Sequence, residues 1–225
     1  MTPRTIALFA IGLVLMAALL FWPAGTLDWW GAWVLLGEFS IASWLIGLWL
    51  WRHDPELLRE RTGGSLQKKQ VFWDKVVMLF LQLAFCGWFV LMAFDAKRWQ
   101  LSHVPRELGY AGAALIALSF FIQWLTFRVN SFASRVVRIQ DERKQTVVTT
   151  GPYRIVRHPM YAGMLLFFVG IPLLLGSWIG FVGVPLMVGL LMIRTLIEES
   201  TLRKELAGYS EYAARVRYRF VPGVW

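Results

Sequence analysis

The chain has 225 residues, of which 57% are hydrophobic and 16% are charged, with a mean hydropathy of +0.54 and a formal net charge of +9. Soluble domains carry about 25% charged residues, so this composition excludes an ordinary soluble domain. The basic residues are spread over loops between apolar runs, which argues against a nucleic-acid-binding protein. We therefore predict an all-α, polytopic integral membrane protein.

Six apolar runs are long enough, or nearly so, to cross the roughly 30 Å hydrocarbon core of a bilayer. They cover residues 5–22, 30–51, 72–94, 108–127, 161–175 and 181–197. The first run exceeds the usual core of a signal peptide and no A-x-A-like site follows it, so we expect a retained helix. The last two runs are short and contain Pro172 and Pro185, and we expect them to form a tight helical hairpin.

The basic residues also indicate how the chain is oriented. If the amino terminus faces the cytoplasm, 20 of the 23 Lys and Arg residues lie on the cytoplasmic side, and only Lys97, Arg98 and Arg106 lie on the other. This asymmetry follows the positive-inside rule, and it predicts that both termini are cytoplasmic. Basic residues next to a membrane attract anionic headgroups at about 1 kcal/mol each, so membrane lipids are expected partners.

Two cytoplasmic loops stand out. In the first, Asp54 and Pro55 predict the start of a helix and Gly63 its end, and we expect this helix to lie on the inner leaflet. The second, 128–158, contains about 30 residues, and loops of this length are usually functional or disordered. Its β-branched and aromatic residues argue for order, with a short extended piece at 136–140.

The second loop ends in the sequence R-H-P-M-Y at 157–161, and Glu198-Glu199 follow near the end of the last apolar run. Ionisable groups at a membrane boundary are costly to desolvate, so we interpret these residues as a site. Pro159 disfavours helical backbone at the residue before it, so the chain should bend there. Adjacent helical residues point about 100° apart, so we expect Glu198 to face a ligand and Glu199 to pair with Arg203.

Several other chemistries are not supported. His158 and a pair of glutamates offer too few ligands for a metal. No G-x-G-x-x-G or Walker loop is present, and no Ser or Cys stands in a nucleophile elbow. The single cysteine, Cys86, lies inside an apolar run and is expected to be a buried small hydrophobe.

The motifs G-P-Y-R at 151–154, R-H-P-x-Y-x-G at 157–163, the glutamate pair, and Y-x-x-Y-x-x-R-V at 209–216 with Pro222 resemble the isoprenylcysteine carboxyl methyltransferase family. That family is related to the membrane phospholipid N-methyltransferases. The resemblance covers 130–225 in the family's order and spacing. It implies a single membrane domain over 1–225, with amino-terminal helices in 1–107 and a methyltransferase core in 108–225, placed in a bacterial inner membrane.

The resemblance further implies S-adenosylmethionine as cofactor and a lipophilic acceptor at the cytoplasmic face, most simply the carboxyl group of an isoprenylcysteine-like substrate. The implied cofactor pocket is formed by the carboxy-terminal half, from Gln140, Val147, Val148, Thr149, Tyr153, His158, Tyr161, Glu198 and Glu199. Arg157 and Arg215 match the arginines that orient the acceptor carboxylate. The chain departs from the family at Gln145, where a histidine is usual, although glutamine still offers a donor and an acceptor.

The nucleophile stays open at this stage. A carboxylate acceptor is already ionised at neutral pH, whereas an amine would need a base such as a glutamate or His158. Phospholipid N-methylation and small-thiol S-methylation are therefore alternatives. Sterol-type reductases share a related H-P-x-Y core and use NADPH, which gives an alternative of another class, and a non-enzymatic membrane subunit or transporter is a further one.

Overall fold

The computed structural model describes residues 3–63 and 70–225, and within these ranges all regular secondary structure is helical. Five helical stretches have the length and apolar composition to cross a membrane: α1 (Pro3–Ala24), α2 (Trp30–His53), α4 (Phe72–Ala93) with its continuation η1 (Phe94–Trp99), α5 (Arg106–Val129) and α7 (Gly180–Glu205). The sixth apolar helix, α6 (Pro159–Leu175), has 17 residues and is about 25 Å long. The predicted all-α, polytopic membrane architecture is confirmed.

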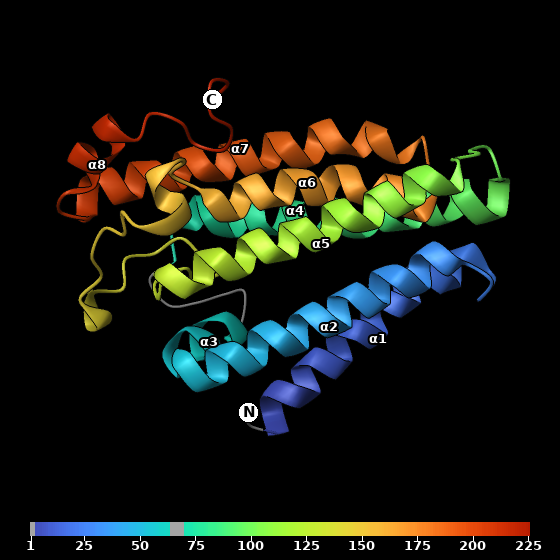
Figure 1. Ribbon diagram of the computed structural model, residues 1–225, viewed down its shortest axis with the longest axis horizontal. Helices are drawn as coiled ribbons and strands as arrows, with labels where there is room; N and C mark the ends of the chain where they lie inside the picture. Colours follow the sequence, from blue (N-terminus) through green and yellow to red (C-terminus); the bar gives the residue numbers. More distant parts are fainter. Residues whose placement is uncertain (1–2, 64–69) are drawn as a thin grey trace.

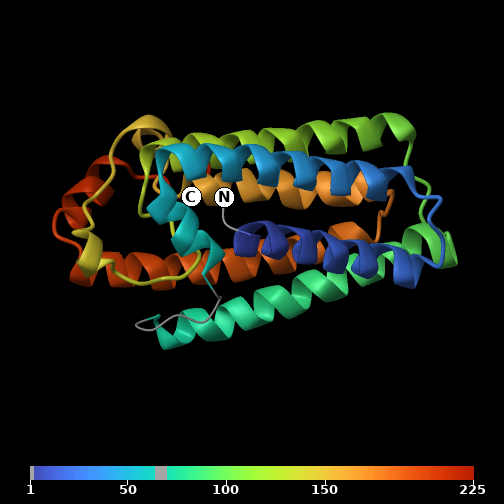
Figure 2. The ribbon, with the colours of Figure 1, turned by 90° about the horizontal axis from the view of Figure 1, so that it is seen from below.

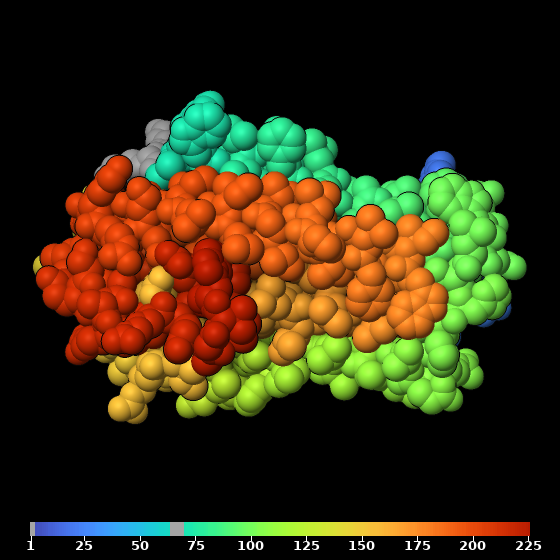
Figure 3. Space-filling view, turned by 90° about the horizontal axis from the view of Figure 1, so that it is seen from above, coloured from blue at the N-terminus to red at the C-terminus, as the bar shows by residue number. Residues whose placement is uncertain are grey.

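The long helices run side by side, and the polar segments gather at the two ends of the bundle (Figures 1 and 2). We call one end the site end. It consists of α3 (Pro55–Thr62), the loop 130–158 with η2 (Asp141–Arg143) and η3 (Gly151–Arg154), α8 (Tyr209–Arg215) and the segment 216–225. We call the other the far end, formed by 25–29, 94–105 and 176–179. Figure 3 shows α8 and the carboxy-terminal segment covering the site end beside α7.

Local sequence explains most helix boundaries. The Asp54 side chain accepts a hydrogen bond from the backbone N–H of Leu57 at 2.9 Å, Pro55 occupies the first turn, and Gly63 caps α3, as predicted. The predicted hairpin is confirmed: α6 ends at Gly176, whose φ of 79° favours glycine, and α7 starts four residues later. The predicted extended piece at 136–140 forms no regular strand.

Helix α7 is longer than its apolar run. The run ends at residue 197, but the helix continues to Glu205, since no helix breaker occurs before Gly208. Both glutamates of the pair therefore lie on regular helix. Close packing fixes this helix against α4: the Trp88 indole donates to the Gly180 carbonyl at 2.6 Å, and a Cβ on Gly183 would collide with the Trp88 ring.

The centre of the bundle is an aromatic and aliphatic core. Phe89, Phe168 and Ile171 are completely or almost completely buried there. On the outside, large apolar side chains are exposed, including Val14 (67%), Leu83 (60%) and Val182 (73%). An exposed apolar surface along long helices is what lipid contact requires, so the chain is an integral membrane protein.

Candidate active site

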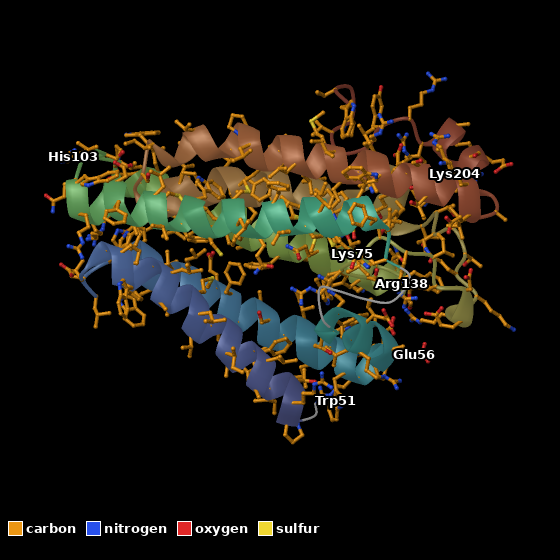
Figure 4. The ribbon with its side chains drawn as sticks, turned by 180° about the vertical axis from the view of Figure 1, so that it is seen from behind. Trp51, Glu56, Lys75, His103, Arg138 and Lys204 are labelled. Carbon is orange, nitrogen blue, oxygen red and sulfur yellow. The ribbon has the colours of Figure 1, made fainter. Side chains whose placement is uncertain are left out.

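A pocket opens at the site end between the loop 130–153, the start of α6, the last turns of α7 and α8. Its empty space, counted together with the open mouth, is about 870 Å³. Its lining includes Val147, Val148, Tyr153, Arg157, His158, Tyr161 and Glu198 among the predicted site residues, together with Asn130, Arg138, Gln145, Met160, Arg194, Tyr209 and Tyr212. Figure 4 places Arg138 and Lys204 at this end and His103 at the opposite end.

The backbone at the motif is held by the carboxy-terminal segment. His158 precedes α6 with φ −127° and ψ 67°, outside the helical region, as the following proline predicts. The N–H of Arg157 donates to the Tyr218 carbonyl and that of His158 to the Arg219 carbonyl, both at 2.9 Å. The two segments are therefore joined by main-chain hydrogen bonds, which fix the entry of the chain into α6.

Glu199 lies at the centre of a buried ion-pair network. Its Oε1 accepts from Arg157 Nε at 2.6 Å and lies 3.2 Å from His158 Nε2, while its Oε2 accepts from Arg219 Nε at 3.1 Å. The Glu199 side chain is only 4% exposed and does not line the pocket. The predicted pairing with Arg203 is wrong, because Arg203 is exposed and the carboxylate turns inward toward the motif and the carboxy-terminal segment.

Glu198 points into the pocket instead. Its Oε2 accepts a hydrogen bond from the Tyr161 hydroxyl at 2.7 Å and lies 3.9 Å from His158 Nδ1. The rings of His158 and Tyr161 are stacked, with centroids 5.5 Å apart. The two neighbouring carboxylates thus face different surroundings, because adjacent residues on a helix point about 100° apart.

Tyrosine hydroxyls form a second set of polar groups. The Tyr153 hydroxyl accepts from Asn130 Nδ2 at 2.6 Å, and the Tyr212 hydroxyl donates to the Tyr153 carbonyl at 2.8 Å. Burial raises the pKa of Tyr212 to about 12 and that of Tyr209 further still, so both stay protonated. The buried Tyr209 hydroxyl has no hydrogen-bond partner among the described residues. It is an unused polar group at the wall of the pocket.

The loop residues divide between wall and support. Val147, Val148 and Gln145 line the pocket, whereas Thr149 is exposed outside it. Gln140 is completely buried, and its amide is already used: Nε2 donates to the Phe132 carbonyl at 2.9 Å and Oε1 accepts from Arg143 at 2.7 Å. Its main-chain N–H donates to Gln145 Oε1 at 2.9 Å, so Gln140 holds the wall in shape from behind.

The two arginines implied for the acceptor lie in different places. Arg157 reaches the pocket, but its guanidinium is bound to Glu199 and donates to the carbonyls of Val216 and Arg217, both at 2.7 Å. Arg215 is exposed at the end of α8 and does not line the pocket.

The sequence reasoning missed Arg194 as a pocket residue. Its Nε donates to Asp74 Oδ1 at 2.9 Å and its Nη2 to the Arg135 carbonyl at 2.6 Å. Asp74 is completely buried. Opposite charges at the ends of two predicted spans were the available signal, because ionisable groups there need a partner.

Among the described residues, no group of three or more His, Cys, Asp or Glu side chains is placed to hold a metal ion. The comparison with protein families gives a match for residues 108–207 to the model of the phospholipid methyltransferase family. No curated protein matches the chain. The family match confirms the predicted resemblance to membrane methyltransferases, since the matched family is related to the isoprenylcysteine enzymes. It covers α5, the loop, α6 and α7, whereas α8 completes the pocket from outside it.

Proposed function

We propose that the protein transfers a methyl group from S-adenosylmethionine to a lipophilic acceptor at the cytoplasmic face of the membrane. The proposal depends mainly on one observation. A pocket formed by the matched segment and α8 is lined by the Glu198 carboxylate and by Tyr209, whose hydroxyl has no hydrogen-bond partner among the described residues.

The residues present fit the polar groups of S-adenosylmethionine, which would supply an activated methyl group. Glu198 can accept hydrogen bonds from an ammonium or from ribose hydroxyls, and the Tyr209 hydroxyl can pair with a carboxylate or a hydroxyl. The Tyr153 ring, which lines the pocket, suits a sulfonium, an interaction worth about 0.5–2 kcal/mol. Gln140, Thr149 and Glu199 do not line the pocket, so we propose that they support its walls and do not contact the cofactor directly.

Methyl transfer is an in-line displacement, so the protein mainly positions the partners and excludes water. The Glu199 network fixes His158 and the carboxy-terminal segment, and this holds Tyr161 and Glu198 in place. An amine acceptor would need a general base, but His158 already faces Glu199 and Glu198 already accepts from Tyr161. A carboxylate acceptor needs none, so we favour O-methylation of an isoprenylcysteine-like acid.

We also propose a setting for the reaction: a bacterial inner membrane, with both termini and the site end in the cytoplasm. The acceptor would enter sideways from the inner leaflet, because the site end lies at the helix ends, where lipid headgroups and helices meet. The cofactor would enter from the aqueous side through the mouth of the pocket.

The first test is calorimetric titration of the purified protein with S-adenosylhomocysteine, with NADPH in parallel. Saturable binding of the former alone supports the methyltransferase, binding of NADPH alone supports a reductase, and binding of neither in folded protein refutes both. Labelled methyl donor then separates the acceptors: a prenylated cysteine derivative, phosphatidylethanolamine and a small thiol. Methylation of phosphatidylethanolamine alone would overturn the carboxylate acceptor.

Arg157 and Arg215 remain candidates for orienting the acceptor through the resemblance. For the exposed Arg215, the variant Arg215→Ala should lose turnover while S-adenosylhomocysteine still binds. Normal turnover in that variant would remove Arg215 from the reaction.

A further inference from the structure

Three arginines from distant parts of the sequence meet beside the pocket. Arg61 lies on α3, Arg135 in the long loop, and Arg194 on α7. The Arg135 guanidinium donates to the Arg61 carbonyl at 3.2 Å, and Arg194 donates to the Arg135 carbonyl at 2.6 Å. We call these residues the arginine cluster. It is adjacent to Tyr161, since the Arg194 guanidinium lies 5.7 Å from the centre of that ring.

Arg61 has hydrogen-bonding capacity to spare. A guanidinium carries five N–H donors. Among the described residues, Nη1 of Arg61 alone is engaged, with the Ala133 carbonyl at 2.8 Å and with Met160 Sδ at 3.9 Å. Its Nε and Nη2 have no acceptor among residues 3–63 and 70–225. Both of its contacts, Ala133 and Met160, line the pocket, so Arg61 lies behind this part of the pocket wall.

The cluster also has an excess of positive charge. Within the described part of the chain, the only carboxylate paired with it is that of Asp74, at 2.9 Å from Arg194. Burial, and then the charges of Arg135 and Arg194, lower the pKa of Arg61 to about 10. The charge of Glu198 also acts on Arg194, so two carboxylates face three guanidinium groups, and an anion would stabilise the remaining positive charge.

The surroundings of Arg61 are apolar on the membrane side. Its guanidinium lies 4.2 Å from the centre of the Phe127 ring. Leu50, Leu58 and Ala133 form a small core with Phe127, and Ile46, Trp49 and Met160 pack against it. A cation with free donors beside an apolar surface matches a molecule with an acid head and a hydrocarbon tail.

We propose that the arginine cluster, with Arg61 as its principal donor, binds the acid head group of the amphiphilic acceptor, a carboxylate or a phosphate, beside Tyr161. This inference rests on the proposed methyltransferase function and names the acceptor side of the same site. Arg61 would hold the head group in a bidentate fork, while Arg194, fixed by Asp74, adds charge from behind. Because Arg61 lies outside the matched segment 108–207, the amino-terminal half would contribute to acceptor choice.

The test uses the full chain in detergent, with S-adenosylhomocysteine affinity measured separately on every variant. Decanoate, decyl phosphate and uncharged decanol are titrated, and the melting temperature is followed. The anions should raise it more than decanol does, by about 3 °C at ten times the dissociation constant. The larger of the two anionic shifts identifies a carboxylate or a phosphate.

Arg61→Gln keeps a donor for the Ala133 carbonyl but removes the charge, and it should abolish the excess shift. Arg59→Gln, an exposed arginine on the same helix, is the matched control and should keep it. An equal excess in Arg61→Gln and the wild type, or none in the wild type, overturns the inference. If Arg61→Gln fails to fold, Arg135→Gln should reduce the excess, and an unchanged value there also overturns it.

Absence of S-adenosylhomocysteine binding in the wild type would instead refute the methyltransferase. The anion titrations would still show whether the arginine cluster binds an acid head group. The two failures are therefore distinguishable. The affinity of Arg61→Gln for S-adenosylhomocysteine should equal that of the wild type, because the cluster lies on the acceptor side.

Discussion

Each end of the bundle buries a carboxylate, and the two accept hydrogen bonds from different kinds of donor. At the far end, Asp95 is completely buried, and its Oδ2 accepts from the hydroxyls of Ser177 at 2.5 Å and Ser102 at 2.6 Å. At the site end, Glu199 is satisfied by the guanidinium groups of Arg157 and Arg219. At the far end, neutral donors join the helix connections. At the site end, Arg157 and Arg219 bind Glu199 and so hold the segment 216–225 in place, with the pocket beside it.

The comparison shows how the same bundle can be closed at one end and keep an open pocket at the other. Hydroxyl donors are short, so they draw the helix connections at the far end together. Arginines are long and can bridge a gap, so the site end stays open while its walls remain fixed. The four predictions below test this contrast, in order of decreasing effect.

Glu199→Ala should have the largest effect. It leaves Arg157 and Arg219 without their buried carboxylate, and breaking a buried ion pair costs about 3–5 kcal/mol. Thermal or chemical unfolding measures the loss, and protease cleavage within 216–225 should increase. Glu205→Ala, exposed on the same helix, should change neither. Wild-type stability in Glu199→Ala would mean that the network does not hold the site end.

Gly183→Ala should be next, because the new methyl group would collide with the buried Trp88 ring. Overpacking of this kind costs about 1–3 kcal/mol. Gly189→Ala, on the same helix with open space around it, should be tolerated. Equal melting temperatures for the two variants would contradict the close packing of α4 and α7.

Asp95→Ala should destabilise the far end by about 1–2 kcal/mol, since the hydroxyls of Ser102 and Ser177 lose their acceptor. S-adenosylhomocysteine affinity should stay at the wild-type value, because the pocket lies at the other end. Asp28→Ala, an exposed aspartate at the same end, is the control for stability. A large fall in the affinity for S-adenosylhomocysteine would show that the two ends are coupled.

Glu198→Gln should have the smallest effect on stability, within about 0.5 kcal/mol, because the amide oxygen can still accept from Tyr161. It should weaken S-adenosylhomocysteine binding about tenfold through the lost charge. Calorimetry gives the affinity, and the melting temperature without ligand gives the control. Unchanged affinity would remove Glu198 from the cofactor side of the pocket.

Most of the fold could be predicted from local sequence. Apolar length gave the six helices, and Asp54 and Gly63 bounded α3, because capping depends on neighbouring residues only. The different directions of Glu198 and Glu199 also followed from helix geometry. The partner of Glu199 did not: the prediction chose Arg203 by its local spacing, whereas Arg219 reaches back from a non-helical segment.

The arginine cluster shows the same limit. Arg61, Arg135 and Arg194 come from three segments, and no periodicity links them. The role of Gln140 was equally hidden, since its side chain bonds to the main chain of Phe132 rather than facing the pocket. Contacts between segments that are distant in the sequence depend on tertiary packing, which a single sequence does not encode in any repeating pattern.

The contact between Gly183 and Trp88 has a consequence for chemistry at a distance. It sets the rotation of α7 about its own axis, and Glu198 lies about 22 Å further along that axis. Rotating the helix by one residue, about 100°, would bring Glu199 to the angular position of Glu198 and turn Glu198 away from the pocket. By fixing this rotation, Trp88 determines which of the two carboxylates faces the pocket, although Trp88 itself is far from it.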